Sequence, residues 1–168
     1  CRRPREPHET YHRRGLPYPH LPFEDYHPDA AQVEALVRDQ GLFGFRERLE
    51  ARRTCCEIRK QLPLQRALVG AEAWLTGLRR EQGPTREALL PVQEEAGRTK
   101  IAPLLDWTSD DVNDFAKAYD VPMHPLHLRG YPSIGCAPCT RPTLVGEPLR
   151  AGRWWWESPE HKECGLHR

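Results

Sequence analysis

Three parts of the chain place apolar residues at the spacing of an amphipathic helix. The first covers residues 29–41, where a terminal glycine is suited to end the helix. The second covers about 45–68, and we expect Pro63 to end or kink it because proline lacks an amide proton and clashes with the preceding turn. The third covers 108–119, where the Thr108 hydroxyl is a helix cap ahead of an acidic first turn.

Short apolar runs between these helices predict strands. Residues 73–77 are typical of a short buried strand that leads into a loop carrying Arg79 and Arg80. Residues 89–93 and 100–104 are two further candidates. The alternation of helix and strand predicts an α/β fold with a mostly parallel sheet covered by helices.

The two ends of the chain carry no such pattern. Residues 1–28 are rich in proline and histidine and predict an irregular N-terminal segment. Beyond Pro122 we expect loops to the end of the chain. At 168 residues, the length fits one domain, 1–168, large enough to bury a core.

Charge and hydropathy exclude two classes of partner. Lysine plus arginine (25) nearly balances aspartate plus glutamate (24), so the net charge of +1 gives no overall field for nucleic acid. An anion site must therefore be built from particular cations. No apolar run reaches membrane-spanning length and no signal-peptide pattern opens the chain, so we expect a soluble, cytoplasmic protein with no membrane partner.

Four cysteines form two pairs, the adjacent Cys55 and Cys56 and the spaced Cys136 and Cys139. A single C-x-x-C pair serves zinc, a redox dithiol or an iron–sulfur cluster equally well. Adjacent residues on a helix point about 100° apart, which favours a wide cluster with separate iron corners over a single zinc ion. The alternative that the adjacent pair is merely buried is weakened by the basic residues on both sides of it.

Cys164 stands alone, close to the end of the chain. This position suits a mobile nucleophile better than a fifth cluster ligand. Lys162 and His167 are placed to favour its thiolate form. An incidental exposed cysteine is the alternative.

Two basic segments are candidates for binding an anion. Arg150 and Arg153 flank a glycine that lets the backbone come close, and arginine binds sulfate or phosphate oxygens in pairs. Arg79 and Arg80 follow a predicted strand, at the edge where α/β sheets bind ligands. Solvated surface for the arginines, and plain core for the tryptophans 154–156, are the alternatives.

Six stretches are specific in combination: Cys-Cys-Glu-Ile-Arg-Lys-x-x-Pro-Leu (55–64), Trp-Leu-Thr-Gly-Leu-Arg-Arg-Glu-Gln (74–82), Lys-Ile-Ala-Pro-Leu-x-x-Trp (100–107), Gly-Tyr-Pro-Ser-Ile-Gly-Cys-Ala-Pro-Cys-Thr-Arg-Pro (130–142), Arg-Ala-Gly-Arg-Trp-Trp-Trp-Glu (150–157) and Glu-Cys-Gly-Leu-His (163–167). In this order they resemble the adenylyl-sulfate (APS) and phosphoadenylyl-sulfate (PAPS) reductase family. The resemblance runs from about Tyr26 to the end of the chain. It implies a Rossmann-like fold of the adenine-nucleotide-hydrolase type.

The resemblance also implies an iron–sulfur oxidoreductase of sulfate assimilation and cysteine biosynthesis. The implied reaction is the reduction of APS to sulfite and AMP through an S-sulfocysteine on Cys164, with thioredoxin or a similar dithiol as reductant. A homo-oligomer is compatible with it. The implied site residues are four ligands of one [4Fe-4S] cluster (Cys55, Cys56, Cys136, Cys139) and the substrate-binding residues Lys60, Arg79, Arg80, Arg150, Arg153 and His167.

The N-terminus departs from the family pattern. Family members begin with a strand and a Ser/Gly-rich phosphate-binding loop, and neither is found here. We therefore expect a partial reductase domain that is N-terminally incomplete, with 158–168 as a mobile catalytic tail. The alternatives are a PAPS reductase, or a truncated four-cysteine fragment that binds zinc or a cluster without turnover. The related ATP-using branch of the fold leaves the Cys164 tail unexplained.

Overall fold

The computed structural model describes residues 20–166, and these divide into two units. The helical unit comprises 24–71 and 156–166, so it joins the first helices to the end of the chain. The sheet unit comprises 20–23 and 72–155.

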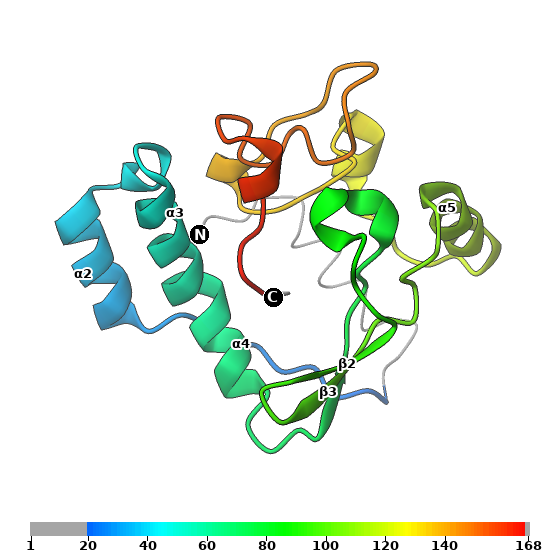
Figure 1. Cartoon of the computed structure of the whole chain (residues 1–168), viewed down its shortest axis with the longest axis horizontal. Coiled ribbons are helices and arrows are strands. Elements are labelled where there is room, and N and C mark those ends of the chain that lie inside the picture. Colours follow the sequence, from blue (N-terminus) through cyan, green and yellow to red (C-terminus); the bar gives the residue numbers. More distant parts are fainter. Residues whose placement is uncertain (1–19, 167–168) are drawn as a thin grey trace. The chain divides into compact units, whose positions relative to one another are not determined.

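The helical unit opens with α2 (Ala30–Gln40), as the apolar spacing predicts (Figure 1). The Asp29 carboxylate accepts from the backbone N–H of Gln32 at 2.9 Å and so caps the first turn. Gly41 ends the helix with φ of 72°, a left-handed value that glycine adopts without strain. A 3₁₀ turn (Gly44–Arg46) follows.

The second predicted helix is one continuous run of three parts: α3 (Leu49–Cys56), a π-helical segment (Glu57–Gln61) and α4 (Leu62–Ala67). The Leu62 N–H donates to the Glu57 carbonyl, five residues back, which marks the wider π turn. Pro63 does not end the run, because the helix continues to Ala67, and the alternative of a kink stays a prediction. The wider turn directly before Pro63 rearranges the hydrogen-bond ladder into which proline cannot donate.

The end of the chain belongs to this same unit. The Trp156 ring lies 6.3 Å from the Phe45 ring and 5.3 Å from the Arg46 guanidinium carbon. A short 3₁₀ turn (Pro159–His161) follows. Residues 167 and 168 lie outside the described part of the chain.

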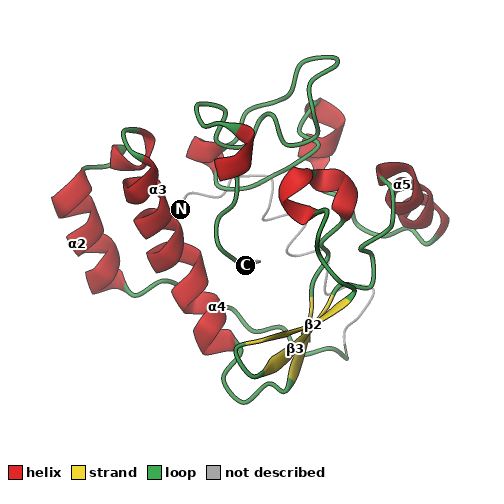
Figure 2. Cartoon of the chain, viewed as in Figure 1, coloured by secondary structure: helices red, strands yellow, loops and turns green. Residues whose placement is uncertain are grey.

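The sheet unit contains β1 (Ala73–Leu75), β2 (Val92–Glu95) and β3 (Arg98–Ile101), ordered β1-β3-β2 (Figure 2). β1 runs parallel to β3, and β2 runs antiparallel to it. The α/β prediction is confirmed, whereas the mostly parallel sheet is corrected to a small mixed sheet within the described residues. The reason is a tight hairpin: Ala96 and Gly97 both take positive φ, which turns β2 directly into β3.

β1 also differs from the prediction of a buried strand, since Leu75 is 71% exposed. The core of the unit lies beyond the strands, where Leu78, Ala102 and Leu105 pack together with Leu89 against them. Two 3₁₀ turns (Arg80–Gln82 and Pro84–Arg86) connect this region.

The third predicted helix is α5 (Ser109–Ala118), opened by a reciprocal cap. The Asp111 N–H donates to Thr108 Oγ1 at 3.1 Å, and the Thr108 N–H donates to the Asp111 carboxylate at 2.8 Å. Beyond α5 the sheet unit holds only loops and the 3₁₀ turns Pro125–Arg129 and Ala137–Cys139 among its described residues, as predicted. None of the described helices is long and apolar enough to cross a membrane.

Candidate functional site

Cys136 and Cys139 are both buried at the two ends of a tight turn in the sheet unit. The Cys139 N–H donates to the Cys136 carbonyl at 2.9 Å, and the Thr140 hydroxyl donates to the same oxygen at 2.9 Å. These two bonds fix the backbone between the two thiols. The C-x-x-C spacing therefore gives the pair of thiols held by one loop that the sequence predicts.

A second segment, 152–154, braces this loop. Trp154 is fully buried, and its backbone N–H donates to the Cys139 carbonyl at 3.0 Å. The Gly152 carbonyl accepts from the N–H of Arg141 at 2.9 Å, and a Cβ at Gly152 would lie 2.2 Å from the Arg141 carbonyl oxygen. The backbone at Gly152 thus comes close to the cysteine loop, whereas the close approach to an anion that the sequence predicts stays a prediction.

Arg153 is buried against the same loop. Its Nη1 donates to the Ile134 carbonyl at 3.1 Å, and its guanidinium carbon lies 4.5 Å from the centre of the Trp154 ring. A Cβ on Gly135 would lie 2.2 Å from Arg153 Nη2, so only glycine leaves room for the guanidinium there. Arg153 therefore places a cation beside the backbone that leads into Cys136.

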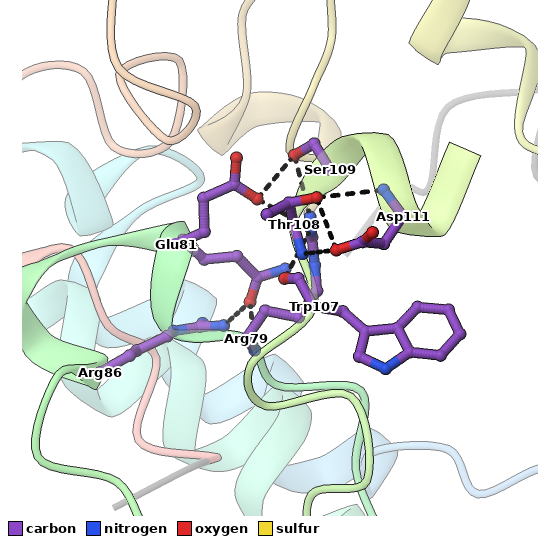
Figure 3. Close-up of polar contacts among 8 residues, drawn as sticks. Arg79, Glu81, Arg86, Trp107, Thr108, Ser109 and Asp111 are labelled. Atoms are coloured by element: carbon purple, nitrogen blue, oxygen red, sulfur yellow. Dashed lines mark hydrogen bonds and ion pairs between the residues drawn. The ribbon is translucent and has the colours of Figure 1, made fainter. Parts of the chain in front are cut away.

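Arg79 and Arg80, the other predicted anion ligands of this unit, hydrogen-bond to groups of their own unit. Arg79 donates to the Glu81 carboxylate at 2.9 Å and to the Ser109 hydroxyl at 3.3 Å, which joins its loop to the start of α5 (Figure 3). Arg80 Nε donates to Asp106 at 2.6 Å and its Nη1 to the Glu87 carbonyl at 2.7 Å.

Arg150 lies near the loop that carries Arg79 and Arg80, since a Cβ added to Gly83 would lie 4.0 Å from Arg150 Cδ. The sequence alone does not identify Glu81 and Asp106 as the acids that accept these arginine hydrogen bonds, because ordinary exposed acids carry no distinguishing pattern.

Cys55 and Cys56 end α3 in the helical unit, directly before the π-helical segment. Cys56 is 5% exposed and Cys55 is half-buried. Burial raises the pKa of the Cys56 thiol, the nearby cations Lys60 and Arg52 oppose that rise, and the Cys164 thiol adds to it. Cys56, Lys60 and Cys164 are therefore electrostatic neighbours within one unit.

The chain end that carries Cys164 is tied to this helix. Cys164 is 9% exposed, and its carbonyl accepts from Gln61 Nε2 at 2.8 Å. Arg52, 1% exposed, binds the Glu157 carboxylate with two nitrogens, at 2.9 and 2.8 Å. Arg52 stands in the basic neighbourhood of Cys55, but its partner 105 residues away is not visible in a sequence pattern.

The predicted ligands and substrate residues divide between the two units. The helical unit brings together Cys55, Cys56, Lys60 and Cys164, and the sheet unit contains Cys136, Cys139, Arg79, Arg80, Arg150 and Arg153. His167 lies outside the described residues. Within residues 20–166, no group of three or more histidine, cysteine, aspartate or glutamate side chains is gathered as a metal site.

The chemistry of the donor set nevertheless fits a thiolate-bound cluster. Each unit supplies one pair of cysteines, and Cys56, Cys136 and Cys164 are free thiols. Cationic side chains lie near a thiol or its loop in both units, Lys60 in one and Arg153 in the other. Such surroundings stabilise the negative charge of thiolates.

Known proteins resemble this chain over most of its length. The family model described as the phosphoadenosine phosphosulfate reductase domain matches residues 13–142. The chain is 49% identical over 158 residues to an adenosine 5'-phosphosulfate reductase of Neisseria meningitidis serogroup B, covering 93% of this chain and 64% of that protein. It is 56% identical over 145 residues to the reductase of the same name from Allochromatium vinosum, covering 84% of this chain and 56% of that one. The chain thus spans less than two thirds of the length of these relatives.

A further relative and one solved structure extend the comparison. An adenosine 5'-phosphosulfate reductase of Rhizobium tropici is 52% identical over 145 residues, which cover 84% of this chain and 80% of that protein. The crystal structure of a phosphoadenylyl-sulfate reductase from Candida auris, in a phosphate complex, matches with a TM-score of 0.64 at 25% identity. The match covers 80% of this chain and 64% of that one.

Proposed function

Because this chain belongs to the phosphoadenosine phosphosulfate reductase family, we propose that it carries out the thioredoxin-dependent reduction of APS to sulfite and AMP in the cytoplasm, during sulfate assimilation and cysteine biosynthesis. The observation that carries the proposal is the identity of about half of all aligned residues with APS reductases. The hydrogen bond from Gln61 to the Cys164 carbonyl, which ties Cys164 to the helix that carries Cys56 and Lys60, supports it further.

The first step is attack by the Cys164 thiolate on the sulfur of APS. An S–S bond forms while the bond from that sulfur to the phosphate oxygen breaks, and AMP leaves with the electron pair. The product on the protein is an S-sulfocysteine. Both reactants are anions, so neighbouring cations lower the barrier by offsetting the charge that gathers as they meet.

The second step needs a dithiol of the thioredoxin class. One thiolate of the dithiol attacks Cys164 Sγ, and sulfite leaves with the electrons of the S–S bond. The second thiol of the reductant then resolves the mixed disulfide and returns Cys164 as a thiolate. Overall, sulfate sulfur gains two electrons, and the dithiol becomes a disulfide.

We assign substrate contacts to Lys60, Arg150, Arg153 and His167. Lys60 is next to Gln61, which donates a hydrogen bond to the Cys164 carbonyl, and this supports a role at the reacting sulfur. For Arg79 and Arg80, the hydrogen bonds to Glu81, Ser109 and Asp106 favour holding the loop after β1 over binding substrate. His167 is assigned from the family resemblance alone.

We further propose that Cys55, Cys56, Cys136 and Cys139 hold one [4Fe-4S] cluster. When bound, such a cluster would tune the electrostatic field near its thiolate ligands, and neither step above requires it to change redox state.

Turnover assays under anaerobic conditions test this proposal. With reduced thioredoxin, APS should yield equal amounts of AMP and sulfite, and PAPS should compete poorly. Preference for PAPS would favour the activity named for the Candida auris protein. Failure to release sulfite from either nucleotide, with acid-labile sulfide equal to bound iron, would contradict the reductase proposal and leave a cluster-binding fragment.

A further inference from the structure

Arg52 is the most deeply buried cation of the helical unit, at 1% exposure. Its five N–H groups all point at acceptors of this unit. Two bind the Glu157 carboxylate, one donates to the His161 carbonyl at 2.6 Å, and one donates to the Glu163 carbonyl at 2.5 Å. The fifth points at Cys56 Sγ at 4.0 Å.

These contacts hold one short piece of chain at three places. Glu157 lies before the 3₁₀ turn Pro159–His161, His161 ends it and Glu163 follows it, so a single guanidinium binds one carboxylate ahead of the turn and two backbone carbonyls at and beyond its end. The next residue is Cys164. Arginine suits this role because its planar fork sets several bond directions at once, which a lysine ammonium cannot do.

Gln61 continues the same attachment beyond Arg52. It donates to the Cys164 carbonyl, and a Cβ at Gly165 would lie 2.3 Å from Gln61 Nε2. Gly165 takes φ of 80°, a left-handed value that favours glycine. The backbone of the nucleophile is therefore held on both sides against the helix that carries Cys55 and Cys56.

We propose that Arg52, through its bonds to Glu157 and to the carbonyls of His161 and Glu163, is the positioning residue that seats Cys164 for its attack on substrate. This inference rests on the proposed function. Seating serves the first step, in which the Sγ of Cys164 must meet a bound anion. The second step needs the adduct to leave the seat and meet a partner protein, so loosening the seat slows the first step and leaves the second as fast or faster.

Variants of Arg52 and Glu157 distinguish a role in positioning Cys164 from a role in the stability of the fold. Arg52→Lys keeps the charge but loses the fork, and Glu157→Gln keeps the shape but loses the carboxylate. Arg53→Lys is the matched control, because Arg53 is the exposed neighbour on the same helix. Bound iron and acid-labile sulfide are measured for each variant, so that loss of the metal centre is not mistaken for loss of the seat.

Two readouts are compared on the full chain: alkylation of Cys164 by iodoacetamide, followed by peptide mass spectrometry, and the rates of the two half-reactions. Losing charged hydrogen bonds should speed Cys164 alkylation about tenfold in Arg52→Lys. Formation of the S-sulfo adduct should slow by as much as about 10²-fold, because a small displacement of a reacting group can reduce a rate by that factor. Release of sulfite from preformed adduct by a dithiol should not slow, and Arg53→Lys should match the parent in all three.

Unchanged alkylation of Cys164 in both variants would overturn the inference, as would an equal fall in both half-reactions together with loss of iron. If the parent forms no adduct at all, the proposed function fails, and the alkylation ratio alone still decides whether Arg52 seats Cys164.

Discussion

Replacing Gly152 by alanine tests the packing of the Cys136–Cys139 loop. A Cβ there would lie 2.2 Å from the Arg141 carbonyl oxygen and 3.2 Å from its carbon, both backbone atoms that no side-chain rotation can move. To reach ordinary contact near 3.4 Å, the two segments must separate. That separation strains the Arg141–Gly152 and Trp154–Cys139 backbone hydrogen bonds, at 2.9 and 3.0 Å.

The expected cost has two parts. Overpacking a filled site costs about 1–3 kcal/mol, and weakening one neighbouring hydrogen bond adds about 1 kcal/mol, for a total of about 2–4 kcal/mol. At about 2–4 °C per kcal/mol for a chain of this size, the melting temperature should fall by roughly 4–16 °C.

Urea unfolding and thermal melting of the full chain measure the effect. Gly77→Ala is the matched control in the same unit, because a Cβ at Gly77 meets no atom within 4 Å and its φ is not left-handed. The control should stay within about 1 kcal/mol of the parent. A Gly152→Ala chain as stable as the Gly77→Ala chain would refute the close approach of these two segments.

Three further predictions concern the backbone at Gly135, the cap of α5 and the assigned cluster ligands. Gly135→Ala should cost about 1–3 kcal/mol in urea unfolding by displacing the buried Arg153 guanidinium, and the cost should nearly vanish in an Arg153→Ala background; equal costs in both backgrounds would contradict this. Thr108→Ala should cost about 1 kcal/mol by removing the cap of α5. Hydrogen bonds from Thr108 lower the pKa of Asp111, so the ionised Asp111 carboxylate stabilises the fold fully above the ordinary carboxyl pKa, and this stabilisation is lost as pH falls through the lowered pKa. If an NMR titration gives the same Asp111 pKa in the parent and in Thr108→Ala, the Thr108 side chain is not the cause of the lowered pKa. Cys139→Ser should lower bound iron and acid-labile sulfide together, whereas Cys164→Ser should leave both at the parental level, and equal loss in the two variants would argue against the assigned ligand set.

The sequence predicts the helices of this protein well because their signals are local. Apolar spacing, the terminal Gly41 and the Thr108 cap give 29–41 and 108–119, and the structure has Ala30–Gln40 and Ser109–Ala118. The sheet is harder, because the apolar runs at 89–93 and 100–104 overlap β2 and β3 only in part, and the charged residues Glu94, Glu95 and Arg98 occupy the hairpin between them. The turn of this hairpin places Ala96 at positive φ, and alanine is not a residue that sequence rules favour in such a turn.

The candidate site divides in the same way. Residue type and spacing mark the two cysteine pairs and Cys164 as candidates, whereas their roles as cluster ligands and nucleophile come from the family resemblance. The hydrogen-bond partners of the arginines cannot be predicted from the sequence, because Arg52 binds Glu157 across 105 residues and Arg80 binds Asp106 across 26. Long-range pairs of this kind depend on the folded chain, so basic segments that suggest anion binding turn out to hold loops and the chain end as well.

The central claim is that Cys164 accepts the sulfo group of APS. Its most direct test is anaerobic incubation of the full chain with sulfur-labelled APS in the absence of reductant, beside a Cys164→Ser chain. The account predicts label bound to the peptide that contains Cys164, none on the variant, and its release as sulfite when a dithiol is added. Label carried equally by both chains, or by neither while AMP is still released, would contradict it.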